Sequence, residues 1–238
     1  MTVPLSAAAT VGPSIYWYLT RATGAISLVL LTASLAIGIA AIGRLQAPGV
    51  PRFVVDGLHR TVSLLAVAFL VVHILTSVLD GFAPISLLDA VIPFGGAYRP
   101  LWLGLGAVAC DLLLAVTITS IVRGRLGYSA WRGVHWLAYA SWPVAVVHGL
   151  GTGSDSQKAW MLVITLVCIA VALAAVVARA AIGWPHNSRL RLGALGVAGA
   201  FALGLAVWLP SGPLAKGWAR RSGTPASLLR PAARGARS

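Results

Sequence analysis

The sequence contains no glutamate, and only 10% of its 238 residues are charged. A soluble domain keeps roughly a quarter of its residues charged, so this composition excludes an ordinary water-soluble protein. Five aspartates stand against eighteen lysines and arginines, which gives a formal net charge of +13. In a soluble protein this excess would suggest nucleic-acid binding. Here the basic residues lie between and after apolar runs, as in a membrane protein, and we expect no nucleic-acid partner.

Cysteine is nearly absent as well. Cys110 and Cys168 both lie inside apolar runs, and neither belongs to a CxxC or CxxCH pattern. This excludes covalent c-type haem attachment and leaves both thiols as small core residues. The segment 1–15 has no basic region ahead of the first apolar run, which favours a membrane span over a cleaved signal peptide.

Long apolar runs are abundant, and the mean hydropathy is +0.88. A transmembrane helix needs about 20 mostly apolar residues. Six segments meet this requirement: 16–43, 53–79, 100–122, 132–151, 159–182 and 190–209. They predict an all-α membrane protein, a bundle of six transmembrane helices in contact with membrane lipid. The last span, with its preceding loop, occupies 184–209, and the basic tail 210–238 has a composition typical of disorder.

The basic residues predict an orientation for these spans. The first, third and fifth loops hold most of the arginines, whereas the second and fourth hold only Arg99 and Lys158 beside three aspartates. The arginines of the odd loops are Arg44, Arg52, Arg123, Arg125, Arg179, Arg189 and Arg191. The positive-inside rule therefore places the odd loops in the cytoplasm and the N-terminus outside. The basic tail, which six spans would also place outside, does not follow this rule.

Four of the five histidines form two pairs in otherwise apolar runs: His59 and His73 in the second, His135 and His148 in the fourth. At 1.5 Å per residue, the two members of each pair lie ~20 Å apart along their helix. Because the second and fourth spans run in the same direction, His59 faces His135 at one depth and His73 faces His148 at the other. Each depth offers two imidazoles, as bis-axial ligation of a haem iron requires. We therefore predict two haems between the second and fourth helices.

The two spacings differ in their rotational geometry. Fourteen residues return to within ~40° of the same helix face, whereas thirteen residues miss it by ~140°. We predict that Pro143 distorts the fourth span and turns His148 back towards its partner. Zinc fits less well, because each depth offers two nitrogens and no carboxylate or thiolate to complete a tetrahedral site. Isolated interhelical histidines, the other interpretation, do not account for two depth-matched pairs.

Four arginines are candidates to bind the anionic haem propionates. Arg60 and Arg132 lie within about one turn of the histidines at the inner depth, whereas Arg21 and Arg99 lie near the outer depth. Snorkelling from helix ends is the alternative for Arg60, Arg132 and Arg99.

Three further polar residues have open interpretations. Asp111, in the middle of the third span, is either a structural hydrogen-bonding group or part of a proton relay. Asp56, about one turn before the first histidine of the second span, either orients that imidazole or favours the helix start. His186 is expected to be a solvated loop residue.

At these residues the chain resembles the ferric-reductase-like transmembrane domain. That superfamily includes the membrane cytochrome b part of NADPH oxidases, ferric reductases and the haem subunit of bacterial methionine-sulfoxide reductase systems. The resemblance covers roughly residues 16–183 and consists of "RATG", the two histidine pairs on alternate helices, and "IPFGGAYRPLWLGLG". It implies a dihaem domain over 16–183, in a bacterial-type plasma membrane, that passes single electrons through two b haems. The oxidases' flavin and nicotinamide module has no counterpart, because the chain has no GxGxxG context after the fifth span.

We therefore expect an electron-transfer subunit that takes electrons from a separate flavoprotein or a membrane quinol. Its acceptor, a molecule or a partner subunit, would lie on the outer face. Two alternatives remain open. One is a quinol-oxidising cytochrome b anchor of a separate catalytic subunit, with a quinone pocket that involves Asp111. The other is a haem-free transporter or assembly factor whose histidines form a proton or metal path.

Overall fold

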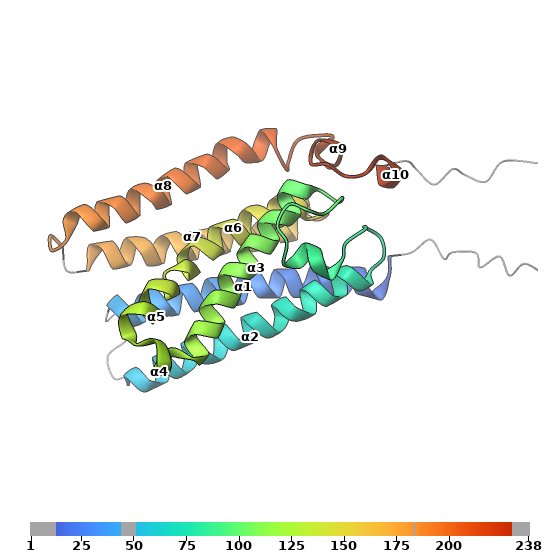
Figure 1. The fold of residues 1–238 in the computed structure, drawn as a ribbon. Coiled ribbons are helices and arrows are strands. Elements are labelled where there is room, and N and C mark those ends of the chain that lie inside the picture. The colour runs from blue at the N-terminus through green and yellow to red at the C-terminus, as the bar shows by residue number, and fades with distance from the viewer. Residues whose placement is uncertain (1–12, 44–50, 183, 230–238) are drawn as a thin grey trace, which may run out of the picture.

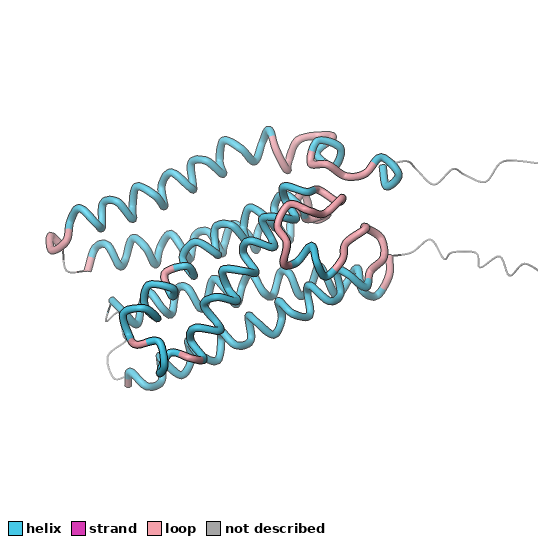
Figure 2. Tube along the Cα trace, viewed as in Figure 1, coloured by secondary structure: helices cyan, strands magenta, loops and turns pink. Residues whose placement is uncertain are grey.

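The structure, a computed structural model, describes residues 13–43, 51–182 and 184–229. Within these ranges the chain forms helices and loops and no strand, which confirms the predicted all-α class (Figure 2). Most of the predicted segment 1–15, the loop that holds Arg44, and residues 230–238 of the predicted tail lie outside the described residues.

Five helices in the described part of the chain are long and apolar enough to cross a membrane. They are α1 (Ile15–Gly43), α2 (Arg52–Leu79), α3 (Pro100–Ile121), α7 (Ala159–Ala181) and α8 (Ser188–Ser211). Large apolar side chains on their outer surfaces are exposed, such as Val197 and Leu203 on α8. Such a surface suits lipid and not water. The chain is therefore an integral, multi-pass membrane protein.

The predicted fourth span, 132–151, is two helices. The helix α5 (Tyr128–His135) ends where Trp136 begins the turn into α6 (Leu137–Thr152). With 16 residues, α6 has a length of about 24 Å, which is less than a full span requires. The prediction of six spanning helices is thus confirmed for five. Pro143 lies inside the continuous helix α6, so the break is at Trp136 and not at the proline.

The helices pack in a bundle around α1 (Figure 1). The helix α1 packs against α2 on one side and against α6 and α7 on the other, whereas α3 packs against α5 and α6, and α8 against α7. Buried side chains of α1, α6, α7 and α8 form the apolar core, which comprises Leu28, Trp142, Val146, Leu150, Cys168, Ile169, Ala172 and Leu205. The indole Nε1 of Trp142 donates to Thr32 Oγ1 at 2.8 Å and so joins α6 to α1 inside this core.

The two ends of the bundle differ in composition. We call the end where α1 and α3 begin the N-terminal end, and the other the opposite end (Figure 1). The opposite end includes the short helix α4 (Arg123–Leu126). Its exposed arginines are Arg52, Arg60, Arg123, Arg125, Arg132 and Arg189. The loops predicted to be cytoplasmic contain four of these arginines, and Arg60 and Arg132 lie just inside the adjacent helices. The orientation itself stays a prediction.

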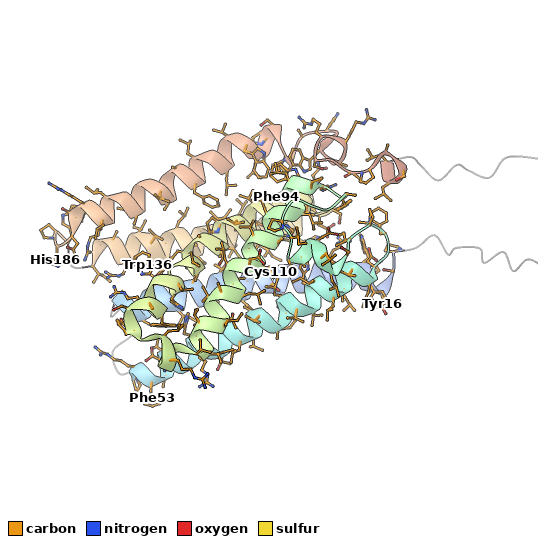
Figure 3. The ribbon with its side chains drawn as sticks, viewed as in Figure 1. Tyr16, Phe53, Phe94, Cys110, Trp136 and His186 are labelled. Carbon is orange, nitrogen blue, oxygen red and sulfur yellow. The ribbon has the colours of Figure 1, made fainter. Side chains whose placement is uncertain are left out.

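The loop between α2 and α3 folds against the N-terminal end. It contains the short 3-10 helix η1 (Leu87–Ala90), whose start is capped by Ser86 and Asp89. Further along, Phe94 lies against α3 (Figure 3). A Cβ atom on Gly104 would come within 2.2 Å of Phe94 Cδ1, so only glycine permits this approach. The motif "IPFGGAYRPLWLGLG" is thus one packed unit of loop and helix.

The predicted disordered tail, 210–238, is described as far as Leu229, and there it is folded. It forms α9 (Trp218–Arg221) and α10 (Ala226–Leu229) over the N-terminal end. The rings of Trp102 and Trp208 stack with centroids 5.1 Å apart, and Trp218 packs beside both. This aromatic cluster joins α3, α8 and the C-terminal segment.

Candidate functional site

The four predicted ligand histidines meet in two pairs between helix layers. At the opposite end, the rings of His59 on α2 and His135 on α5 have centroids 6.3 Å apart and are inclined by 73°. Towards the N-terminal end, His73 on α2 contacts α1 at the Thr20 carbonyl, and His148 on α6 contacts α3 at the Trp102 carbonyl. The helix α2 makes its close contacts with α1 and η1, whereas α5 and α6 pack against α3. Each pair therefore joins the layer of α1 and α2 to the layer of α3, α5 and α6.

Helix periodicity explains why α2 presents both of its histidines to one neighbour. A spacing of fourteen residues places His59 and His73 on nearly the same face, and that face packs on α1. Gly24 and Gly38 of α1 are also fourteen residues apart. The Cβ atom that an alanine would carry at Gly24 would lie 2.9 Å from His73 Cε1, and at Gly38 it would lie 3.2 Å from His59 Cε1. Each imidazole therefore lies directly on the α1 backbone.

Both of these imidazoles bind a main-chain carbonyl of α1. His73 Nδ1 lies 2.8 Å from the carbonyl oxygen of Thr20, and His59 Nδ1 lies 3.0 Å from that of Ser34. A carbonyl oxygen only accepts hydrogen bonds, so Nδ1 carries the proton in each ring. Nε2 is then the unprotonated nitrogen, which is the form that binds a metal.

The same arrangement holds His148 against α3. Its Nδ1 lies 2.8 Å from the carbonyl oxygen of Trp102. A Cβ atom on Gly106 would come within 2.5 Å of His148 Cε1 and 2.6 Å of its Nδ1. His148 therefore also carries its proton on Nδ1, which leaves Nε2 unprotonated.

His135 differs from the other three. Its Nδ1 is buried and finds no hydrogen-bond partner among the described residues. The ring lies beside Trp131, with centroids 5.0 Å apart, and Trp131 Nε1 donates to Ser120 Oγ at 3.3 Å. His135 therefore contacts the Trp131 ring, whereas each of the other three imidazoles contacts a glycine and a main-chain carbonyl.

The predicted propionate-binding arginines fall into two groups. Arg60 and Arg132 are exposed at the opposite end, near His59 and His135. At the N-terminal end, Arg99 is 6% exposed and is engaged by protein groups. It donates to the carbonyl oxygens of Gly151 and Thr152 and to Thr224 Oγ1. Arg99 thus binds the end of α6 and the C-terminal segment together.

Arg21 is likewise engaged. Its guanidinium forms an ion pair with Asp155 in the loop between α6 and α7. It also lies over the Trp17 ring, 3.7 Å from the centroid. The predicted outer arginines therefore have protein partners, whereas the inner pair is exposed.

The other three polar residues singled out in the sequence make no contact that assigns them a role in the site. Asp111 is half-buried on α3 beside Cys110, and Asp56 is exposed. His186 is exposed in the turn between α7 and α8, far from the bundle interior (Figure 3). Across residues 13–43, 51–182 and 184–229, no three His, Cys, Asp or Glu side chains gather as a metal cage.

Sequence reasoning missed the glycines. Gly24 ends the "RATG" motif and Gly106 lies in "WLGLG", yet both were noted only as part of a resemblance. A usable signal was present, because Gly24 and Gly38 repeat the fourteen-residue spacing of the histidines in the next helix.

Comparison with known protein families decides what kind of domain this is. The family model described as "Ferric reductase like transmembrane component" matches residues 22–146, slightly more than half of the 238 residues. The chain belongs to this family. The match confirms the resemblance seen in the sequence, and it includes three of the paired histidines and ends two residues before His148. No curated protein and no solved structure matches the chain significantly. Membership in the ferric-reductase-like family supports an oxidoreductase-type role in the membrane.

Proposed function

We propose that this chain carries electrons across a bacterial-type plasma membrane through two b haems. His59 and His135 would hold one haem, and His73 and His148 the other. The observation that supports this most directly is the state of the imidazoles: three of the four donate Nδ1–H to a carbonyl, which leaves Nε2 for a metal. A haem iron bound at each pair would take up and pass on one electron at a time.

The donor set suits haem. A porphyrin supplies four nitrogens and needs only two axial ligands, and each pair offers two imidazoles. The 6.3 Å between the ring centroids of His59 and His135 accommodates two metal–nitrogen bonds of about 2 Å each. A protein-bound zinc ion would require four ligands, and no such cage exists in the described part of the chain.

The residues around the pairs have complementary roles. The segment of α2 between His59 and His73 is mostly apolar, which suits the membrane interior between the two levels. Arg60 and Arg132 are exposed near one pair and free to bind propionates there. At the other level, Arg99 and Arg21 stabilise the surrounding protein.

The proposal also includes partners on both sides of the membrane. The odd loops face the cytoplasm if the positive-inside rule holds, so the electron donor binds at the opposite end or arrives through the membrane. The proposed donor is a separate flavoprotein or a membrane quinol. Each electron leaves to an acceptor on the outer face.

The haem content of the purified protein tests this proposal. Full-length protein from haem-replete cells should contain two b haems per chain and show their α-band in a reduced-minus-oxidised spectrum. A colourless preparation from such cells would overturn the proposal. His73→Ala and His148→Ala should each remove the same haem, whereas His59→Ala and His135→Ala should remove the other. His186→Ala is the matched control, because this histidine is exposed and distant from both pairs.

A further inference from the structure

We propose that Gly24, Gly38 and Gly106 are positioning residues, each of which sets the orientation and donor strength of one axial histidine. Gly24 acts on His73, Gly38 on His59 and Gly106 on His148. This inference rests on the proposed function, because it assigns the imidazoles to haem iron.

The three sites share one geometric rule. Thr20, Ser34 and Trp102 supply the carbonyls that accept from the imidazoles. Each of these residues lies four positions before the glycine that the same imidazole touches. In an α-helix, the carbonyl of residue i−4 accepts from the N–H of residue i, and one of its lone pairs remains. The Nδ1–H of the neighbouring helix uses this second lone pair.

The absence of a side chain at the glycine makes this second bond possible. A Cβ atom there would stand beside the shared carbonyl and would meet the imidazole at 2.9 Å for Gly24, 3.2 Å for Gly38 and 2.5 Å for Gly106. Distances below about 3 Å force the ring or the helix to move. An alanine therefore lengthens or breaks the Nδ1–H bond most at Gly106 and least at Gly38.

The bond has consequences for a bound metal. A hydrogen bond from Nδ1–H to a carbonyl fixes the tautomer and the plane of the ring and makes Nε2 a stronger donor. Loss of such a partner typically weakens metal binding about 10–100-fold. His135 has no such hydrogen bond from Nδ1. The pair of His59 and His135 therefore has one histidine with an Nδ1–H bond to a carbonyl, and the pair of His73 and His148 has two.

The test compares alanine variants of the full-length, haem-loaded protein. Gly106→Ala and Gly24→Ala should alter the low-spin EPR signal and the midpoint potential of one haem, and Gly38→Ala those of the other. Haem retention should fall most in Gly106→Ala, by about 10–100-fold, and least in Gly38→Ala.

Two controls match these variants. Gly149 follows His148 directly and Gly57 lies two residues before His59, yet a Cβ atom at either position has nothing within 4 Å. Gly149→Ala and Gly57→Ala should keep the wild-type EPR signals, potentials and haem content. If folded Gly24, Gly38 and Gly106 variants match these controls, the inference is wrong.

A measurement on the wild-type protein covers the case in which a variant does not fold. Redox-induced infrared difference spectra with ¹⁵N-labelled histidine should distinguish three hydrogen-bonded Nδ1–H groups from one without a carbonyl partner. Four equivalent groups would overturn the inference. A protein without haem would refute the proposed function, whereas a dihaem protein with four equivalent imidazoles would refute the glycine roles alone.

Discussion

His59 on α2 and His135 on α5 face each other with ring centroids 6.3 Å apart, and the helix break at Trp136 follows His135 immediately. A continuous helix would place His135 and His148 ~140° apart around its axis. The break separates α5 from α6, so each histidine is oriented by its own helix. Pro143, by contrast, lies within α6.

Pro143→Ala should therefore leave both histidine pairs intact. The helix gains one backbone donor, and the turn at Trp136 still orients His135. We expect two haems per chain and unchanged EPR signals. As a contrast, one alanine inserted inside the continuous helix α6, between Val144 and Ala145, rotates His148 by ~100° relative to the preceding part of α6 and should abolish the site of His73 and His148. Loss of a haem from Pro143→Ala would show that the proline, and not the break, orients the ligands.

Much of this arrangement could be predicted from the sequence because apolar runs and their periodicity report directly on membrane helices. The bounds of α1, α2, α3, α7 and α8 follow from run length alone. The meeting of His59 with His135 follows from two spans that run in the same direction. Both features can be read along the sequence, because in a bilayer an apolar segment must form a helix to satisfy its backbone hydrogen bonds.

Other features depend on contacts that the sequence does not display. The break after His135 falls in "VHWLAY", which holds no proline or glycine, so no local signal marks it. The sequence predicts Arg99 as a propionate-binding residue, but it does not show that Arg99 donates to the C-terminal segment and to the end of α6. That segment also packs Trp218 on a surface that Trp102 and Trp208 provide.

Arg99→Ala should release the C-terminal segment. The buried guanidinium donates three hydrogen bonds, and its loss leaves the Gly151 and Thr152 carbonyls without that donor. We expect a loss of about 1–3 kcal/mol in the free energy of unfolding. Trypsin should also cleave faster at Lys216, and mass spectrometry would identify the site. Arg125→Ala is the control, since Arg125 is exposed at the opposite end. Equal cleavage rates in wild type and Arg99→Ala would contradict this role.

Arg21 and Asp155 should behave as a coupled pair. Removing one partner leaves a largely buried charge uncompensated, so Arg21→Met and Asp155→Asn should each destabilise the protein by about 3 kcal/mol. The double variant should lose less than the sum of the two, because no unpaired charge remains. Unfolding in detergent, followed by circular dichroism, gives the coupling energy. Additive effects would mean that the two side chains act independently. Asp56→Asn, at an exposed position, should be neutral.

The two haems should differ in midpoint potential, with the higher value at the pair of His59 and His135. An Nδ1–H bond to a carbonyl strengthens the axial ligand and stabilises the oxidised iron, and this pair has one such bond where the pair of His73 and His148 has two. Exposed cationic side chains at the opposite end act in the same direction, because they favour the reduced state. A potentiometric titration at the α-band should therefore resolve two one-electron steps. His73→Ala should remove the lower step and His59→Ala the higher, and the reverse assignment would show that other surroundings of the haems outweigh these ligand hydrogen bonds.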